Sequence, residues 1–326
     1  MTVVLHVEQA GFAAVQDLGR PGHGGVGIAG NGAADAHAAR LANTLVGNAP
    51  GRPLVEVTGS AYAFTSSADV LVAVTGAAER VSVGGAVQPA GELLTVPAGS
   101  RVTVEAPARG WRSYVAVNGL IDSASTLGSV APDSLLGVGT RLSAGDTLTL
   151  RTRYAGLDHP HSRVPVFRLS APRAELGAVD VTAGPELDEF GADALDGEYE
   201  VSPQSDQVGL RLLGPAPERS ASTEILSRGV PVGAVEVPPG GGLLVLLRGR
   251  LVTAGYPVIG VATTVSVDRL GQVRPRDTLT FSRRTNDEAV AALRRRDSAL
   301  GALAVRVRAA LTSSGIGHVL DDGQPP

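Results

Sequence analysis

Short apolar or alternating segments, divided by glycine and proline, recur along most of the chain. Residues 69–74 form a near-continuous apolar run, which is typical of a buried strand. Residues 101–105 alternate between polar and apolar side chains, the period of a half-exposed strand. Residues 111–117 form an aromatic and β-branched segment that ends at Asn118. The pattern predicts that residues 1–155 make up a first domain built mainly of strands.

The same pattern resumes after a polar, proline-broken segment at residues 151–163, which we interpret as a linker. Short strands at roughly ten-residue spacing, with turn signals between them, are typical of a sandwich or barrel. Strands and helices do not alternate, which disfavours a doubly wound parallel sheet. We therefore expect a second strand-rich domain over residues 164–284. Its expected strands are residues 164–169, 179–182, 198–201, 208–213, 234–237, 243–247 and 278–281.

A first helix is predicted by the apolar residues between Ala38 and Leu45, which recur at helical spacing. Gly47 follows at the position where a C-terminal helix cap belongs. We expect a helix over residues 35–46, with Asp35 near the N-terminal end, where the helix dipole favours a carboxylate.

A second helix is predicted near the C-terminus. Residues 285–288 have the sequence of a capping box, in which a threonine and a glutamate satisfy each other's backbone amides. An apolar stripe follows, so we expect a helix over residues 286–310. Residues 285–326 would then form a helix and a flexible polar tail outside the two strand-rich domains.

The composition narrows the possible functions. The 326 residues are 43% hydrophobic but only 3% aromatic, and the net charge is −4, so no nucleic-acid partner is expected. The chain has no cysteine, which excludes disulfides, thiolate nucleophiles and Cys-ligated zinc. It has no lysine, which excludes a phosphate-loop lysine and covalently attached biotin. No secretory signal and no membrane-spanning apolar run are visible, and we expect a cytoplasmic protein without membrane contact.

Polar residues gather around the first predicted helix. Asp17 and Arg20 could face a ligand, with the guanidinium gripping a carboxylate or phosphate bidentately. The alternative is a turn in which Asp17 caps backbone amides and Arg20 pairs with a neighbouring acid. Asn31 and Asp35 could face a ligand or cap the helix. Asn43 could line a polar pocket, or it could form hydrogen bonds with the backbone of a loop.

Three linked segments carry a resemblance to a known family: Gln16–Gly22, Gly32–Asp35 and Leu41–Asn48. Their order resembles the N-terminal signature of the allophanate hydrolase subunit 2 family, whose members are also called 5-oxoprolinase C subunits or biotin-dependent carboxyltransferase proteins. The resemblance runs from residue 7 to about residue 283. Its further matching segments are residues 205–212, 224–241, 248–257 and 271–275.

The sequence departs from the family pattern at several polar positions. Asn31 stands where the family usually has serine, Gln207 where it has arginine, and Glu236 where it has glutamine. Gly249 replaces an acid, and residues 251–252 replace an amide and a hydroxyl. These changes indicate either an altered substrate or a site that relies on groups from a partner.

The resemblance implies a mainly β fold with a few helices, arranged as two cyclophilin-like β-barrel domains. It implies a subunit of an ATP-dependent amide or lactam hydrolase, of the 5-oxoprolinase or allophanate-hydrolase type, acting with an allophanate hydrolase subunit 1 type partner. ATP would bind to this chain, to the partner or at their interface. Carried onto this sequence, the catalytic residues are Asp17, Arg20 and Asp35. The substrate-binding residues are Asn31, Asn43, Arg211, Glu236, Thr253 and Tyr256.

Two other functions stay open. Family relatives pair with a kinase-inhibitor-like subunit 1 protein, so the chain could be a non-catalytic regulatory module. It could also be the carboxyltransferase component of a urea-carboxylase-like system, with N-carboxybiotin delivered by another chain. We expect no metal: Asp158, His159 and His161 form the one histidine cluster of the sequence, and their proline-broken setting favours solvated side chains.

Overall fold

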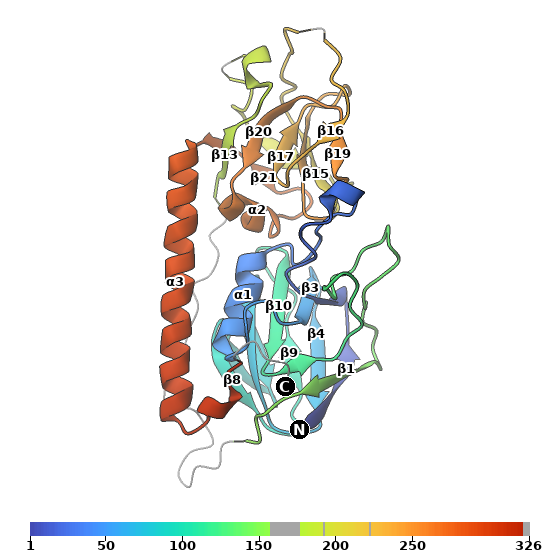
Figure 1. The fold of residues 1–326 in the computed structure, drawn as a ribbon. Helices are drawn as coiled ribbons and strands as arrows, with labels where there is room; N and C mark the ends of the chain where they lie inside the picture. The colour runs from blue at the N-terminus through green and yellow to red at the C-terminus, as the bar shows by residue number, and fades with distance from the viewer. Residues whose placement is uncertain (157–176, 192, 222, 322–326) are drawn as a thin grey trace. The chain divides into compact units, whose positions relative to one another are not determined.

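The computed structural model describes residues 1–156, 177–191, 193–221 and 223–321. Backbone contacts divide the chain into two compact units, and Figure 1 labels many of their helices and strands. Unit 1 consists of Met1–Gly19, Ala36–Ala174 and Asp297–Pro326, and unit 2 of Arg20–Asp35 and Glu175–Arg296. Strands hold 33% of the residues and helices 18%, so the predicted mainly β fold with a few helices is confirmed.

Unit 1 is built from two antiparallel sheets. The first has seven strands in the order β11-β12-β1-β4-β9-β6-β7, and the second has five in the order β2-β3-β10-β5-β8. Their bounds are β1 Thr2–Gln9, β2 Ala13–Gln16, β3 Leu54–Thr58, β4 Tyr62–Ser66, β5 Val70–Gly76, β6 Arg80–Val83, β7 Ala86–Pro89, β8 Leu93–Val96, β9 Val102–Val104, β10 Arg112–Val117, β11 Leu120–Ile121 and β12 Thr147–Arg151.

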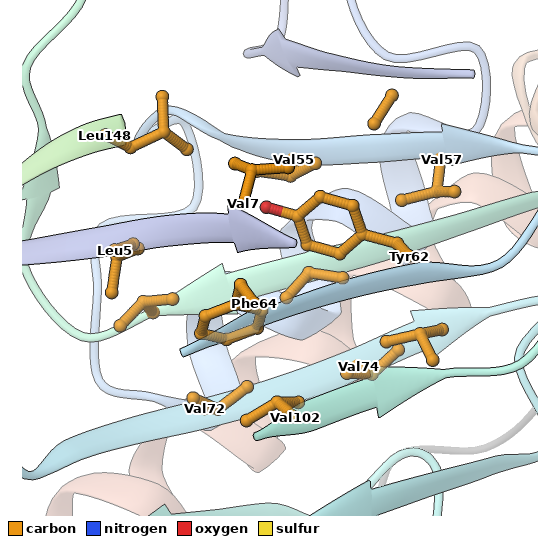
Figure 2. Packing of buried hydrophobic residues seen from close by; sticks show 14 of the residues in the cluster. Leu5, Val7, Val55, Val57, Tyr62, Phe64, Val72, Val74, Val102 and Leu148 are labelled. Atoms are coloured by element: carbon orange, nitrogen blue, oxygen red, sulfur yellow. The ribbon is translucent and has the colours of Figure 1, made fainter. Parts of the chain in front are cut away.

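One hydrophobic core contains residues from both sheets of unit 1 (Figure 2). On β1 the alternate residues Val3, Leu5 and Val7 are buried, as expected for a strand with one face on a core. Tyr62 and Phe64 of β4 are both fully buried, and their ring centroids lie 5.8 Å apart. Because aromatic residues are scarce, valine and leucine fill most of the remaining space.

The helix α1 (Ala36–Leu45) packs against β5 and β10 of the five-stranded sheet. The prediction of a helix over residues 35–46 is confirmed to within one residue at each end. The Thr75 hydroxyl of β5 donates a hydrogen bond of 2.6 Å to the carbonyl oxygen of Ala38. Gly47 follows the helix with a φ of 79°, the left-handed conformation expected of a cap.

Unit 2 contains an eight-stranded sheet in the order β21-β14-β15-β18-β17-β20-β13-β22. Its two outer strands, β21 and β22, are separated in sequence by Thr280 alone, so the sheet curls into a nearly closed barrel. The bounds are β13 Val179–Ala183, β14 Tyr199–Val201, β15 Gly209–Leu213, β17 Ala234–Glu236, β18 Leu243–Leu246, β20 Val258–Ala262, β21 Thr278–Leu279 and β22 Phe281–Arg283. The predicted strand at 278–281 is therefore divided in two.

A two-stranded ribbon of β16 (Arg228–Gly229) and β19 (Thr253–Ala254) accompanies this sheet. We call it the β16–β19 ribbon. Ala254 of the ribbon packs with Ala234 and Val258 in a small apolar cluster, separate from the main core of unit 2. The ribbon therefore covers part of the sheet face that the main core does not use.

Two further α-helices belong to the described residues of the C-terminal half. The sequence patterns did not predict α2 (Thr264–Leu270), because it is too short to show periodicity; the Thr263 side chain caps it by accepting from Ser266 N. The long helix α3 (Asn286–Ser313) was predicted over 286–310 and is confirmed. Its capping box is also present: Glu288 Oε2 accepts from Thr285 N, and Thr285 Oγ1 accepts from Glu288 N.

The division of the chain differs from the predicted ranges of 1–155, 164–284 and 285–326. Residues 20–35 and 285–296 belong to unit 2, and residues 297–326 belong to unit 1. The assignment of residues 297–326 has a simple cause, because Leu303, Val307 and Leu311 of α3 are buried. The predicted strand 164–169, most of the predicted linker and the histidine cluster lie outside the described residues.

The core of unit 1 yields a stability prediction. Phe64→Ala should lower the free energy of unfolding by about 3–5 kcal/mol, because it opens a cavity in a filled core. Phe12→Ala is the matched control: Phe12 is 78% exposed, so its loss should change stability by less than about 0.5 kcal/mol. Urea denaturation of both variants measures the difference, and equal losses would contradict the assigned core.

Candidate functional site

The segment of residues 20–35, which we call the signature loop, is anchored in unit 2 by its backbone. Arg20 N donates 2.7 Å to Gly30 O, which closes the loop on itself around the short 3₁₀ turn η1 (Gly24–Val26). Asn31 N donates 3.1 Å to Arg248 O. Asn31 also has a φ of 51°, a left-handed conformation that asparagine tolerates better than most residues. The Arg20 side chain is 1% exposed, so the predicted ligand-gripping guanidinium is buried.

The end of the signature loop lies directly against the end of α2. A Cβ atom added to Gly271 would lie 2.6 Å from the carbonyl carbon and oxygen of Ala34, closer than real atoms approach. Gln272 Nε2 donates 2.8 Å to Asp35 Oδ2, and both side chains are 2% exposed. Asp35 is thus a buried carboxylate held by a neutral amide.

A buried ion-pair network supports the same region. Asp268 of α2 accepts from Arg248 Nη2 and from Arg296 Nη1, each at 2.7 Å. The Asp268 side chain is 5% exposed, so both pairs are shielded from solvent and bind more strongly than surface pairs. Among the described residues, the buried Arg248 Nε has no hydrogen-bond partner.

Three of the positions that depart from the family pattern meet beside the signature loop. Gly249 N donates 3.0 Å to Gln207 O. A Cβ atom at Gly249 would lie 2.9 Å from Gln207 O and 3.0 Å from Asn31 Oδ1. With Asn31 in this position, the site has little room for any side chain at residue 249. The changes at residues 31, 207 and 249 are therefore spatially coupled.

A second polar group of unit 2 centres on Glu236 of β17, which is 1% exposed. Glu236 pairs with Leu244 on one neighbouring strand and, across a bulge, with Val258 on the other. Burial raises the pKa of Glu236 to about 7, although the charge of Arg228 acts in the opposite direction. The carboxyl is therefore partly protonated near neutral pH.

Arg228 is held by a second carboxylate, Glu186. Glu186 Oε2 accepts from Arg228 Nη2 and, at 2.9 Å, from Val258 N. Burial alone would raise the pKa of Glu186, but these two hydrogen bonds and the charges of Arg228 and Arg219 outweigh it, and the pKa is lowered. Glu186 and Glu236 thus form a pair of carboxyls whose environments push their pKa values apart.

The other predicted substrate-binding residues of unit 2 are exposed. Arg211 lies on the solvent face of β15, between the buried Leu210 and Leu212. Thr253 is exposed on the β16–β19 ribbon, where it pairs with Gly229. Tyr256 is 40% exposed just beyond the ribbon. Their roles as substrate contacts stay predictions.

Asp17 belongs to unit 1 and caps backbone amides in a turn, which was the alternative to its ligand-facing role. Its Oδ1 accepts from Gly19 N at 2.8 Å and from Ser129 Oγ at 2.6 Å. Its Oδ2 accepts from Val130 N at 2.9 Å. Both carboxylate oxygens are committed to holding two loops together, which supports a structural role for Asp17.

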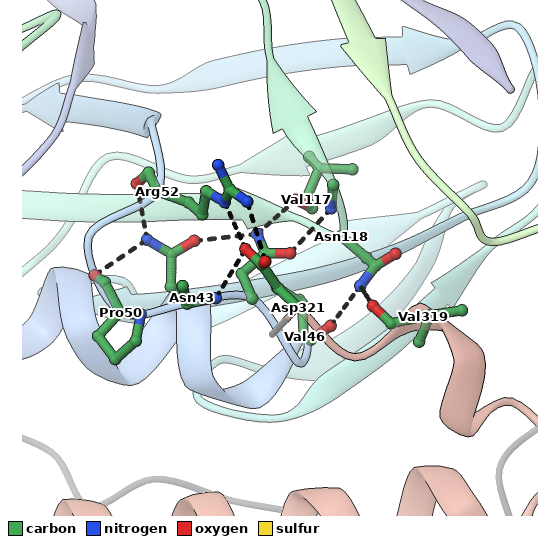
Figure 3. A network of polar contacts seen from close by, with 11 residues as sticks. Asn43, Val46, Pro50, Arg52, Val117, Asn118, Val319 and Asp321 are labelled. Carbon is green, nitrogen blue, oxygen red and sulfur yellow. Dashed lines mark hydrogen bonds and ion pairs between the residues drawn. The ribbon is translucent and has the colours of Figure 1, made fainter. Parts of the chain in front are cut away.

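Asn43 is the centre of a network of loop-holding contacts in unit 1 (Figure 3). Its Nδ2 donates 2.8 Å to Arg52 O, and its Oδ1 accepts from Asn48 Nδ2 at 3.1 Å. Arg52 in turn forms a bidentate ion pair with Asp321. Asn118 Nδ2 donates to the carbonyl oxygens of Val46 and Val319. Asn43 itself is 0% exposed, so the structure supports the role in which its side chain forms hydrogen bonds with loop backbone.

Within the described ranges, no three histidine, aspartate or glutamate side chains are grouped so as to hold a metal ion. Over the same part of the chain, no helix combines the length and the apolar character needed to cross a membrane.

Comparison with known families identifies the chain. The family described as "Carboxyltransferase domain, subdomain A and B" matches residues 26–283, which include most of the signature loop and nearly all of unit 2. The chain belongs to this family. The family resemblance expected from the signature segments is thereby confirmed.

Members and neighbours of the carboxyltransferase-domain family differ in size. The chain is 31% identical over 300 residues to the C subunit of 5-oxoprolinase from Escherichia coli, covering 89% of this chain and 94% of that protein. It is 25% identical over 294 residues to urea amidolyase of Saccharomyces cerevisiae, covering 82% of this chain but 16% of the yeast protein. The Kluyveromyces lactis urea carboxylase structure shares the fold, with a TM-score of 0.82 over 92% of this chain and 29% of that chain, at 22% identity.

Sequence patterns missed several residues of this family member's candidate site. Asp268 was missed because α2 was not predicted, and Glu186 because it lies in no segment that matches the family. Gln272 stood inside the matching segment 271–275 but was assigned no role. Arg228 and Arg248 stood inside matching segments but received no role. A capping threonine at residue 263 was the available signal for α2.

The close approach of Gly271 to Ala34 yields a second prediction. Gly271 has helical φ and ψ, so Gly271→Ala tests steric contact alone. It should displace the signature loop and cost about 1–3 kcal/mol of stability. Gly301→Ala in α3, with nothing within 4 Å, should instead stabilise by about 1 kcal/mol. Thermal unfolding measures both, and hydrogen exchange of residues 30–35 reports the loop; unchanged exchange in Gly271→Ala would contradict the anchoring.

A third prediction separates the two roles considered for Asn43. Asn43→Ala leaves buried carbonyl groups without donors and should cost about 1–3 kcal/mol of stability. Because the side chain faces loop backbone, substrate affinity measured below the melting temperature should be unchanged. Loss of affinity with an unchanged melting temperature would support the binding role instead.

Proposed function

We propose that this chain is one subunit of an ATP-dependent hydrolase that opens an amide or lactam bond, of the 5-oxoprolinase type. The observation that carries the proposal is the match to the Escherichia coli 5-oxoprolinase C subunit, which extends over 94% of that protein. A second 5-oxoprolinase C subunit, from Haemophilus influenzae, is 29% identical over 296 residues. Both relatives are named as subunits, which supports a heteromer; we assign the partner to the allophanate hydrolase subunit 1 type.

The polar groups around the signature loop supply the chemistry of the proposed site. Opening an amide requires a donor for the carbonyl oxygen, where negative charge develops, and a group that takes up or delivers a proton. We assign the first role to the buried Arg248 Nε–H, a donor without a partner among the described residues. We assign the second to Asp35, whose carboxylate Gln272 orients.

We propose that the nucleotide is bound with groups from the partner subunit. The sequence has no lysine, so it has no phosphate-loop lysine. Arg248 and Arg296 of unit 2 are both engaged with Asp268. We therefore place ATP on the partner subunit or at the shared interface, and we derive no step of the reaction through it.

A carboxyltransferase activity is the second candidate. The family description and the match to yeast urea amidolyase favour it. In that case biotin must arrive on another chain, since no lysine is present to carry it. The regulatory alternative, in which the chain pairs with a kinase-inhibitor-like subunit 1 protein without catalysing a reaction, predicts no turnover of any amide.

A reconstituted assay tests the proposed function. The chain co-purified with its subunit 1 type partner should release ADP with 5-oxoproline, and much less with allophanate or urea. Asp35→Asn keeps the size of the side chain but not its basicity, and should lower the rate by about 10²–10⁴-fold with little change in melting temperature. Asp287→Asn, at an exposed residue of α3, is the control and should retain full activity.

Three outcomes distinguish the functions. Carboxyl transfer from free N-carboxybiotin without ADP release would favour the carboxyltransferase. A stable heteromer without turnover would favour the regulatory module. Full activity in Asp35→Asn would show that Asp35 is not a catalytic residue, but it would not contradict the proposed function.

A further inference from the structure

Unit 1 has a small pocket beside the end of β12. We call residues 317–321, which follow α3 and include the 3₁₀ turn η3 (Gly317–Val319), the C-terminal segment. The pocket is lined by the loop after α1, by residues 118–120 and 151–153, and by residues of the C-terminal segment. Its volume is about 30 Å³. Because about 10–15 Å³ is enough for one water molecule, the pocket can hold about two waters or one small polyatomic group.

Positive charge predominates in the lining of this pocket. Its three arginines are Arg52, Arg151 and Arg153, whereas Asp321 is its single acid. Both oxygens of Asp321 are already engaged, because Oδ1 accepts from Arg52 Nη2 at 2.9 Å and Oδ2 accepts from Arg52 Nε and from Ala49 N. Figure 3 shows this ion pair, whose two residues line the pocket. Arg151 and Arg153 therefore have no counter-charge in the lining.

The alternation of β12 explains why two arginines reach the same pocket. Leu150, Thr152 and Tyr154 are buried, whereas Arg151 is half-buried and Arg153 is exposed. Side chains of an extended chain point alternately to opposite faces, so the two arginines share the face away from the core. Because Arg153 is exposed, a ligand can reach the pocket from solvent.

The guanidinium of Arg151 also lacks a hydrogen-bond acceptor. Its Nε is buried, and no residue in the described part of the chain accepts a hydrogen bond from it. An unsatisfied buried N–H costs stability, and such atoms are uncommon in folded proteins. Arginine pairs best with two oxygens of one carboxylate or phosphate, through two parallel N–H groups. An anion in the pocket would supply both the acceptor and the charge that this side chain lacks.

We propose that this pocket of unit 1 binds the carboxylate or phosphate group of a small molecule. The Arg151 guanidinium pairs with two oxygens of the group, and the exposed Arg153 adds a second positive charge. The pocket has room for the anionic group alone, so the rest of the ligand lies outside it. The site is one of binding, without a covalent step. It is independent of the proposed function, because none of its lining residues belongs to unit 2.

Binding at this pocket should also stabilise the docked C-terminal segment. Asn118 Nδ2 donates 3.1 Å to Val319 O, and Asp321 N donates 2.9 Å to Gly47 O. These contacts hold the segment against unit 1 and so complete the pocket. A ligand that binds only the complete pocket stabilises the docked state by mass action. Anion binding should therefore raise the melting temperature and slow the amide hydrogen exchange of the C-terminal segment.

Calorimetry on the full chain tests the site with two probes, inorganic phosphate and acetate, in a chloride buffer of constant ionic strength. At least one probe should bind, and the same probe should raise the melting temperature and protect the C-terminal segment from exchange. The tighter of the two identifies the anionic group of the ligand. Chloride controls for general screening of surface charge. If neither probe has an effect beyond that of chloride, the proposal is wrong.

Substitutions in the pocket locate the binding. Arg151→Met keeps an unbranched side chain but removes the guanidinium, and should weaken binding of the preferred probe about tenfold or more, because charge-assisted hydrogen bonds are lost. Arg151→Lys keeps the charge without the paired donors, so its affinity should fall between the two. Arg153→Met should have a smaller effect, since this side chain is exposed and its charge is screened. Arg109→Met, at another exposed residue of unit 1, is the matched control and should bind as the wild type does.

Melting temperatures in chloride alone separate a binding role of Arg151 from a structural one. Because its Nε has no partner among the described residues, Arg151→Met should melt no lower than the wild type and should no longer respond to the probe. A lower melting temperature with an unchanged response to the probe would show that Arg151 is structural and would overturn the site. If Arg151→Met does not fold, Arg151→Lys and Arg153→Met still decide the question, since wild-type affinity in both would contradict the proposal.

Discussion

The close backbone approach of Gly271 to Ala34 is the constraint on which the candidate site depends. No side chain larger than a hydrogen atom fits at residue 271 without moving the signature loop. The approach places Gln272 within hydrogen-bonding distance of Asp35, and the Asn31 amide on Arg248 continues the anchoring along the loop. Glycine at a single position at the end of α2 thus allows a segment from the N-terminal part of the sequence to become part of unit 2.

Two groups of ion pairs, around Asp268 and around Glu186, organise the polar interior of unit 2. Asp268 is satisfied by two arginines, and Glu186 by an arginine and a backbone amide. Within the described residues, the buried side-chain atoms of unit 2 that have no hydrogen-bond partner include Tyr199 Oη, Glu236 Oε1, Arg248 Nε and Arg296 Nε. An unpaired buried polar atom costs stability. Of these atoms, Arg248 Nε is the one that we propose donates to the substrate.

The departures from the family pattern form a coupled set in three dimensions. Asn31 is larger than the serine that usually occupies its position, and Gly249 is smaller than the usual acid. The space a side chain would need at residue 249 is bounded by Asn31 Oδ1 and Gln207 O. Removal of an acid at 249 and of an arginine at 207 also leaves the local charge balance unchanged. The three changes therefore accommodate one another at one place beside the signature loop.

Hydrophobic periodicity determined the mainly β fold, α1, α3 and most of the strands of unit 2, because these depend on local alternation and on capping residues such as Thr285. The resemblance of the signature segments to a known family also followed from sequence, and it selected Asp35 and Glu236. Only the tertiary structure decided that the signature loop belongs to unit 2, that Gln272 reaches Asp35, and that Arg228 and Glu186 lie by Glu236. The hydrogen bonds from Arg228 to Glu186 and from Gln272 to Asp35 join residues 42 and 237 positions apart, and no local pattern encodes which distant loops meet. Asp17 and Asn43 show the same limit of sequence reasoning. The same residue types occur in turns and in ligand-binding sites, and only the surrounding structure tells the two roles apart.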